Sequence, residues 1–114
     1  MKFEDMDVWK RACRLSVMIY RELADLKDYG FKDQITRSGL SVPSNIAEAF
    51  GRSTDKEKRN FLNYAKDSCA ELRTQAYIGI EIGYINRDIG RKWVAESNEI
   101  SAMISAIMKY LNES

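Results

Sequence analysis

The sequence contains no histidine, two cysteines and a single proline among its 114 residues. Without histidine, the chain cannot form a Ser-His-Asp triad, a zinc site of the HExxH type or the Glu-x-x-His ligand set of a di-iron bundle. Cys13 and Cys69 stand in separate apolar-periodic segments without CxxC spacing. We therefore expect two small core residues rather than a disulfide or a metal pair, and we predict no metal site and no cofactor.

Long apolar runs and a strong net charge are also missing. No run approaches the ~20 residues of a membrane span, and the start, MKFEDMDVWKRACR, is charged where a signal peptide carries an apolar segment. We therefore expect a cytoplasmic protein with no membrane partner. The 18 basic and 17 acidic residues give a net charge of +1, which by itself does not indicate a nucleic-acid binder.

Apolar residues recur at steps of three and four in four segments, each of which we predict to be an α-helix. Short connections between such helices favour antiparallel neighbours. The predicted fold class is all-α, one antiparallel up-down four-helix bundle domain over residues 1–114, with a long third helix. The expected helices run from an N-cap at Asp5 or Asp7 to just before Gly30, from about Phe31 to Phe50, from Thr54 to about Ile85, and from about Asp88 to Leu111.

The third predicted helix has recognisable signals at both ends. Thr54 and Glu57 form a capping-box pattern, in which each side chain bonds the other residue's backbone amide. Asn86 is expected to terminate the helix. Small residues, including Gly79 and Gly83, follow one of its faces, which predicts the close approach of another helix.

The only proline, Pro43, lies inside the second predicted helix, in the stretch SGLSVPSNIAEAF. A proline there removes one backbone hydrogen bond and crowds the carbonyl four residues earlier, which belongs to Gly39. The apolar spacing keeps its phase across the proline, which predicts one kinked helix rather than two. We expect the Ser44 hydroxyl to donate to the Leu40 carbonyl and to offset part of the loss.

Polar residues form a stripe beside the apolar face of this helix and continue on the next one. We interpret the stripe as a structural hydrogen-bond network that fixes the helix register at the kink. The alternative is a site in which Glu48 and Glu71 act as paired carboxylates. The network is predicted to contain Gln34, Arg37, Ser41, Pro43, Ser44, Asn45, Glu48, Ser68 and Glu71, with Arg52 and Gln75 at its ends.

Two groups of basic residues are candidate nucleic-acid contacts. One is a ridge on the first helix, opposite its apolar stripe, and the other surrounds the start of the third helix, where free amides add positive potential. A solvated charged face explains either group as well, and Asp55 and Glu57 dilute the charge of the second one. The candidates are Lys10, Arg11, Arg14 and Arg21 in the ridge and Arg52, Lys56, Lys58 and Arg59 in the second group.

More large apolar side chains are present on the last two helices than one bundle core can accommodate. Wide apolar stripes are one interpretation and a subunit interface is the other, and the sequence favours neither. The surplus residues are Tyr64, Tyr77, Ile78, Ile82 and Ile85 with Met103 and Met108.

The segments DVWKRACRLSVMIY, YGFKDQITRSGLSVPSNIAEAFGR, FLNYAKDSCAELRTQ and GYI, in this order, resemble the four helix bundle protein family, also described as 23S ribosomal RNA intervening-sequence proteins. The stretch SVPSNIAE with Arg52 is the most specific part. The resemblance implies a homopentamer. It extends to accessory proteins of diversity-generating retroelements, which are basic pentameric barrels that bind nucleic acid and a reverse transcriptase.

Three functions follow as hypotheses. The first is a non-enzymatic oligomeric adaptor or scaffold that binds structured RNA or DNA, or a nucleic-acid enzyme. The second is an assembly with a protein partner and no nucleic acid. The third, an enzyme that uses Glu48 and Glu71, has the least support in the sequence, and we expect no enzymatic activity.

Overall fold

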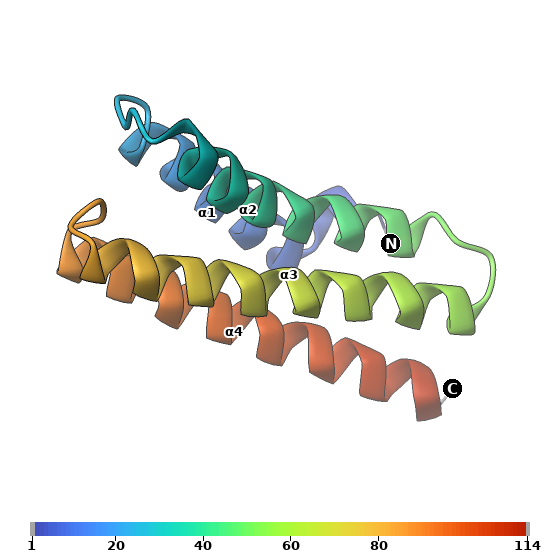
Figure 1. The fold of residues 1–114 in the computed structure, drawn as a ribbon. Coiled ribbons are helices and arrows are strands. Elements are labelled where there is room, and N and C mark those ends of the chain that lie inside the picture. Colours follow the sequence, from blue (N-terminus) through green and yellow to red (C-terminus); the bar gives the residue numbers. More distant parts are fainter. Residues whose placement is uncertain (1, 114) are drawn as a thin grey trace.

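The protein is a bundle of four helices in a computed structural model that describes residues 2–113. No strand occurs within these residues, and the bundle measures 46 × 21 × 19 Å. Figure 1 shows the α1–α2 and α3–α4 connections at one end and the α2–α3 connection at the other. The predicted four-helix bundle is confirmed. Its elements are the short 3-10 helix η1 (Phe3–Asp5), α1 (Asp7–Glu22), α2 (Tyr29–Phe50), α3 (Asp55–Glu81) and α4 (Arg87–Glu113).

The four helices do not pack against one another equally. α2 lies against both α1 and α3, and α3 also packs along α4. The contact between α1 and α4 is the least extensive of the four. None of the helices in the described part of the chain is long and apolar enough to cross a bilayer.

The core consists of the apolar stripes that the periodicity predicts. Each of its central side chains is at most 3% exposed, and burial of a large apolar side chain stabilises a fold by about 1.5–3 kcal/mol. Cys69 is buried among them and Cys13 is half-buried, and both are free thiols. The central residues include Val8, Leu15 and Ile19 from α1, Ile35, Val42 and Ile46 from α2, Leu62 and Leu72 from α3, and Trp93, Ile100 and Ile104 from α4.

The ends of α1 differ from the prediction. Its N-cap is Met6, which provides no side-chain hydrogen bond, while Asp5 belongs to η1 and Asp7 is the first residue of α1. The helix ends at Glu22, well before Gly30. Gly30 instead lies in the first turn of α2, because the Asp28 carboxylate accepts a hydrogen bond from the Phe31 amide at 3.1 Å and starts that helix early.

The N-cap of α3 is Thr54, as predicted. Its hydroxyl accepts from the Glu57 amide at 3.1 Å. The Glu57 carboxylate does not complete the capping box at the Thr54 amide, because it accepts from the Thr54 hydroxyl at 3.2 Å.

The C-terminus of α3 was predicted too late, because Gly83 ends the helix. Gly83 has a φ of 82°, a left-handed conformation that glycine adopts without steric cost. The Tyr84 amide donates to the Gly79 carbonyl at 2.9 Å and the Gly83 amide to the Ile80 carbonyl at 3.1 Å. These two bonds form a Schellman motif. Gly83 therefore stands outside the helix seam in which it was expected.

The chain then folds back on α3 before α4 begins. Ile85 is 3% exposed, and a Cβ atom on Gly79 would lie 2.4 Å from its Cδ1 atom. Gly79 thus provides the predicted close approach, and its neighbours are both Ile85 of the following turn and Phe31 of α2, whose Cζ atom would lie 2.9 Å from the added Cβ. Asn86 does not end α3. Its side-chain oxygen accepts from the amides of Asp88 and Ile89, at 2.9 and 3.2 Å, and so caps α4.

α2 continues through Pro43, which is buried inside the helix. A single helix therefore spans this stretch, while a bend at the proline stays a prediction. Gly39, the residue four positions earlier, allows α1 to approach, since a Cβ atom there would lie 3.2 Å from Cδ1 of Ile19. A second helix with its own start after the proline is excluded.

Candidate functional site

The basic ridge on α1 is formed by three residues that project into solvent. Lys10, Arg14 and Arg21 are exposed, and at 100° per residue they lie within about 40° of one another. None of the three forms an ion pair with a described residue. This surface, the α1 ridge, is therefore available to an anionic partner.

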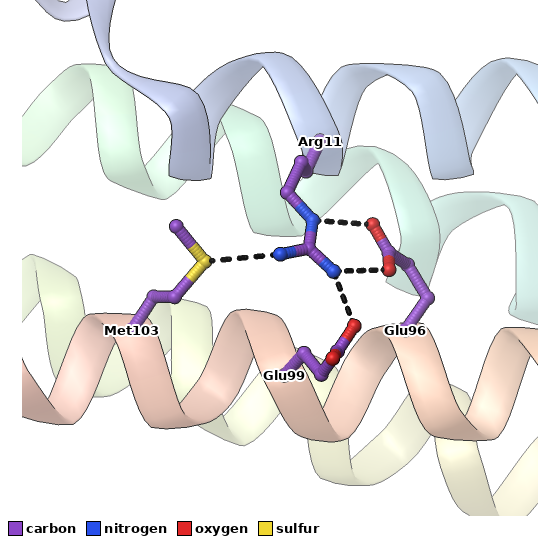
Figure 2. Close-up of polar contacts among 4 residues, drawn as sticks. All are labelled: Arg11, Glu96, Glu99 and Met103. Atoms are coloured by element: carbon purple, nitrogen blue, oxygen red, sulfur yellow. Dashed lines mark hydrogen bonds and ion pairs between the residues drawn. The ribbon is translucent and has the colours of Figure 1, made fainter.

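Arg11 was predicted to belong to the same ridge, but its side chain turns toward α4 (Figure 2). Its Nε atom donates to Glu96 Oε2 at 2.8 Å and its Nη2 atom to Glu96 Oε1 at 2.5 Å. The same Nη2 also pairs with Glu99, and Nη1 lies 3.6 Å from the sulfur of Met103. All three guanidinium nitrogens are therefore engaged within the chain.

The ion pair between Arg11 and Glu96 is partly shielded from water. The side chains are 28% and 29% exposed. The hydrogen bond from Arg11 lowers the pKa of Glu96, and the hydrogen bonds to Glu96 and Glu99 raise the pKa of Arg11. Such a bidentate pair is among the stronger charge-assisted contacts. Arg11 therefore joins α1 to α4, and its prediction as a phosphate contact was wrong.

Sequence reasoning assigned no role to Glu96 and Glu99. Their three-residue spacing places both on one face of α4, which is the available signal. It does not identify their partner, because that depends on how α1 is positioned along α4.

The second basic group lies at the α2–α3 connection and is less available than the ridge. Arg52 pairs with Glu48 one turn earlier, and its guanidinium carbon lies 4.5 Å from the centre of the Phe61 ring. Lys56 is exposed, whereas Lys58 and Arg59 are half-buried. The group therefore offers one exposed cation, Lys56, at the start of α3.

The two basic groups do not form one compact surface. Arg21 lies in the last turn of α1, beside the α1–α2 connection, and Arg52 lies in the α2–α3 connection at the other end of the bundle (Figure 1). Arg21 and Arg52 are thus separated along the bundle, whereas Lys10 lies in the first turn of α1, away from the α1–α2 connection.

The polar stripe forms a set of hydrogen bonds between α2 and α3. The Ser41 and Ser68 hydroxyls lie 2.7 Å apart across the helix contact. The Asn45 amide nitrogen donates to both the carbonyl and the hydroxyl of Ser41, each at 2.9 Å. Ser38 donates to the Gln34 carbonyl at 3.0 Å and contacts the Glu71 carboxylate at 3.5 Å. These contacts fix Ser41 opposite Ser68.

Ser44 and Glu48 stand apart from this network, and the Arg37 side chain forms no ion pair with a described residue. Ser44 is exposed, and within the described residues its hydroxyl makes no bond to the Leu40 carbonyl, so that expectation was wrong. Asn45 provides the side-chain bond near the proline instead.

The two candidate carboxylates lie far apart. Glu48 pairs with Arg52. Glu71 reaches Ser38, ten positions and so about 15 Å along α2 from Glu48. Glu48 and Glu71 therefore do not form a carboxylate pair.

The surplus apolar residues divide into two sets. Ile85 is in the core, and Met103 and Met108 pack against it. The other four are roughly half exposed, and so belong to the surface of the single chain. They are Tyr64 at 51%, Tyr77 at 55%, Ile78 at 49% and Ile82 at 52%.

The chain is similar to proteins whose role is unknown. The model of a family described as 23S rRNA-intervening sequence protein matches residues 4–106. A solved structure from Bacteroides thetaiotaomicron VPI-5482, a protein of unknown function from the S23 ribosomal protein family, is 28% identical with a TM-score of 0.83. That match covers 90% of this chain and 98% of the other. No curated protein matches the sequence.

Proposed function

Because the chain belongs to the 23S rRNA-intervening sequence protein family, we propose that it is a non-enzymatic adaptor that assembles into an oligomer and binds structured RNA or DNA. The observation that carries this proposal is the α1 ridge. Lys10, Arg14 and Arg21 share one exposed face, and none of the three forms an ion pair with a described residue. Free cations in a row are the groups that contact phosphates.

Assembly would place several α1 ridges in one particle and so compensate for the small charge of the single chain. One copy has a net charge of +1, so three cations on one ridge give a weak contact. Several copies in one particle present several ridges to the same nucleic acid, and linked contacts raise the overall affinity without new chemistry. We expect the homopentamer that the family resemblance implies.

Exposed apolar side chains on α3 support the assembly. Tyr64, Ile78 and Ile82 lie within about 40° on one face of the helix at 100° per residue, and each is about half exposed. Large apolar side chains gathered on one face are typical of subunit contacts. We propose this face of α3 as part of the surface between copies.

The binding proposal is tested by fluorescence anisotropy with a labelled RNA hairpin and a labelled DNA duplex over a salt series. Phosphate contacts release counterions, so the logarithm of the binding constant should fall linearly with the logarithm of the salt concentration. Binding that is absent at low salt, or that does not change with salt, would reject the proposal.

A second candidate function is an assembly that binds a protein and no nucleic acid. It is favoured by the balanced net charge of +1 together with the exposed face of α3. This candidate predicts a defined protein partner that co-purifies after nuclease treatment, and no salt-dependent binding to RNA or DNA.

A further inference from the structure

A small pocket opens between α2 and α3 beside the paired serines. Its volume is about 240 Å³, below the ~300–1,000 Å³ of pockets that bind drug-sized ligands. Serine side chains are small, so the helix contact leaves this space open where larger residues would fill it. All residues of its wall are polar or charged: Gln34, Arg37, Ser38 and Ser41 from α2, and Ser68 and Glu71 from α3.

The inner wall of the pocket has a spare hydrogen-bond donor. Ser38 and Ser68 are 5% and 8% exposed, so their hydroxyls belong to the interior. Ser41 already accepts a hydrogen bond from Asn45. In the bond between Ser41 and Ser68, one hydroxyl donates its proton and the other accepts it. Each hydroxyl has one proton, so the second proton of this pair has no acceptor among the described residues.

Two opposite charges face the same pocket without neutralising each other. Arg37 comes from α2 and Glu71 from α3, and neither forms an ion pair with any residue that the structure describes. The Glu71 carboxylate has only the 3.5 Å contact with the Ser38 hydroxyl. A guanidinium and a carboxylate are thus left free on opposite walls.

A buried acceptor without a partner also lies on α3, one turn beyond Glu71 and outside the wall of the pocket. The side-chain oxygen of Gln75 is buried and has no donor among the described residues. Gln75 follows Glu71 by four positions, one helical turn along the same face. A buried polar atom without a partner is costly, and native structures contain few of them.

We propose that this pocket binds a small zwitterion of the α-amino acid class. Arg37 and the spare serine proton match a carboxylate, and the Glu71 carboxylate matches an ammonium group. A simple anion would be repelled by Glu71 and a simple cation by Arg37. This inference does not depend on nucleic-acid binding.

The proposal is tested by titration of the ¹⁵N-labelled full chain with L-serine, propionate and propylamine, followed by amide chemical shifts. L-Serine should produce saturable shifts at Ser38, Ser41 and Ser68, with an affinity about tenfold above either singly charged compound. No saturable shift with L-serine, or equal affinities for all three compounds, would overturn the proposal.

Two charge-removing variants separate binding from a structural role. Glu71→Gln should weaken L-serine by about tenfold and strengthen propionate, while Arg37→Gln should weaken L-serine and strengthen propylamine. Both residues are exposed, so the helical circular dichroism should stay unchanged. Glu81→Gln and Arg91→Gln remove exposed charges outside the pocket and should leave the affinities for L-serine, propionate and propylamine unchanged. Variants that lower all three affinities alike would contradict the proposal.

Another copy of the chain could cover the pocket instead of a small ligand, because Tyr64 and Ile78, which we assign to the contact between copies, lie on the same face of α3 as Glu71. The titration is therefore repeated at two protein concentrations whose oligomeric state is known from sedimentation. Shifts that follow protein concentration and not L-serine would assign the pocket to that contact and refute ligand binding. Shifts that follow L-serine at both concentrations would support it.

Discussion

The Arg11 guanidinium holds both carboxylate oxygens of Glu96, at 2.8 and 2.5 Å, and so joins α1 to α4 (Figure 2). These two helices make the least extensive helix contact in the bundle. Because this contact is the least extensive, a polar bond contributes a larger share of the attachment here than it would between α2 and α3.

Replacement of Arg11 by alanine should destabilise the protein. The change removes three charge-assisted hydrogen bonds, two to Glu96 and one to Glu99, and leaves Glu96 without its partner. Partial exposure limits the loss to about 1–2 kcal/mol. Urea unfolding followed by circular dichroism measures it. Lys10→Ala, at the exposed neighbouring position, is the control and should cost less than about 0.5 kcal/mol. Equal unfolding free energies for the two variants would contradict the assigned role of Arg11.

The same ion pair predicts a pH dependence of stability. Arg11 lowers the pKa of Glu96 in the folded state, below its unfolded value of about 4.3. The stabilisation is therefore complete above that value and is lost as the pH falls through the lowered folded pKa. The gap in unfolding free energy between the natural chain and Glu96→Gln should shrink between about pH 5 and pH 3. A gap that stays constant over this range would argue against the pair.

Gly79→Ala should destabilise the end of α3. The new Cβ atom would lie 2.4 Å from Cδ1 of Ile85 and 2.9 Å from Cζ of Phe31, and overpacking of this kind costs about 1–3 kcal/mol. Gly30→Ala is the matched control, because its nearest atom is 3.7 Å away and alanine favours a helix by about 1 kcal/mol over glycine. Thermal melts should move down for Gly79→Ala and stay level or move up for Gly30→Ala. The reverse order would refute the packing of Ile85 on Gly79.

The proposed assembly predicts the mass of the native particle. One chain has a mass of 13.2 kDa, so a pentamer sediments as a species of about 66 kDa, five times that mass. Exchange of Ile78 and Ile82, two half-exposed residues, for serine should shift the distribution toward smaller species without loss of helical signal. Leu40→Ser, at a comparably exposed position on α2, is the control. A monomer for the natural chain would overturn the assembly.

Periodicity predicted the four helices and their buried faces because core packing repeats along each helix. The helix ends were less predictable. Asp28, Gly83 and Asn86 all perform ordinary capping, but several residues near each end suit that role equally well. Gly83 was assigned to a helix face because its spacing fitted the pattern, although its left-handed conformation ends the helix.

The candidate site was predictable only as far as single helices allow. The α1 ridge depends on the spacing of Lys10, Arg14 and Arg21 alone, and the structure leaves all three exposed. The position of Arg11 depends on Glu96 of α4, far along the chain. Contacts between helices follow from their relative register, which the spacing within one helix does not contain.

The salt dependence of nucleic-acid binding by a variant without the α1 ridge tests the central claim most directly. Lys10, Arg14 and Arg21 are replaced together by glutamine, and Arg87, Arg91 and Lys109, three exposed residues of α4, are replaced in the control. Anisotropy with the labelled RNA hairpin should show weaker binding for the ridge variant, with a log–log salt slope lower by about one for each phosphate that the variant no longer neutralises. The control should keep most of the affinity and slope. Equal slopes for the natural chain and the ridge variant would contradict the account.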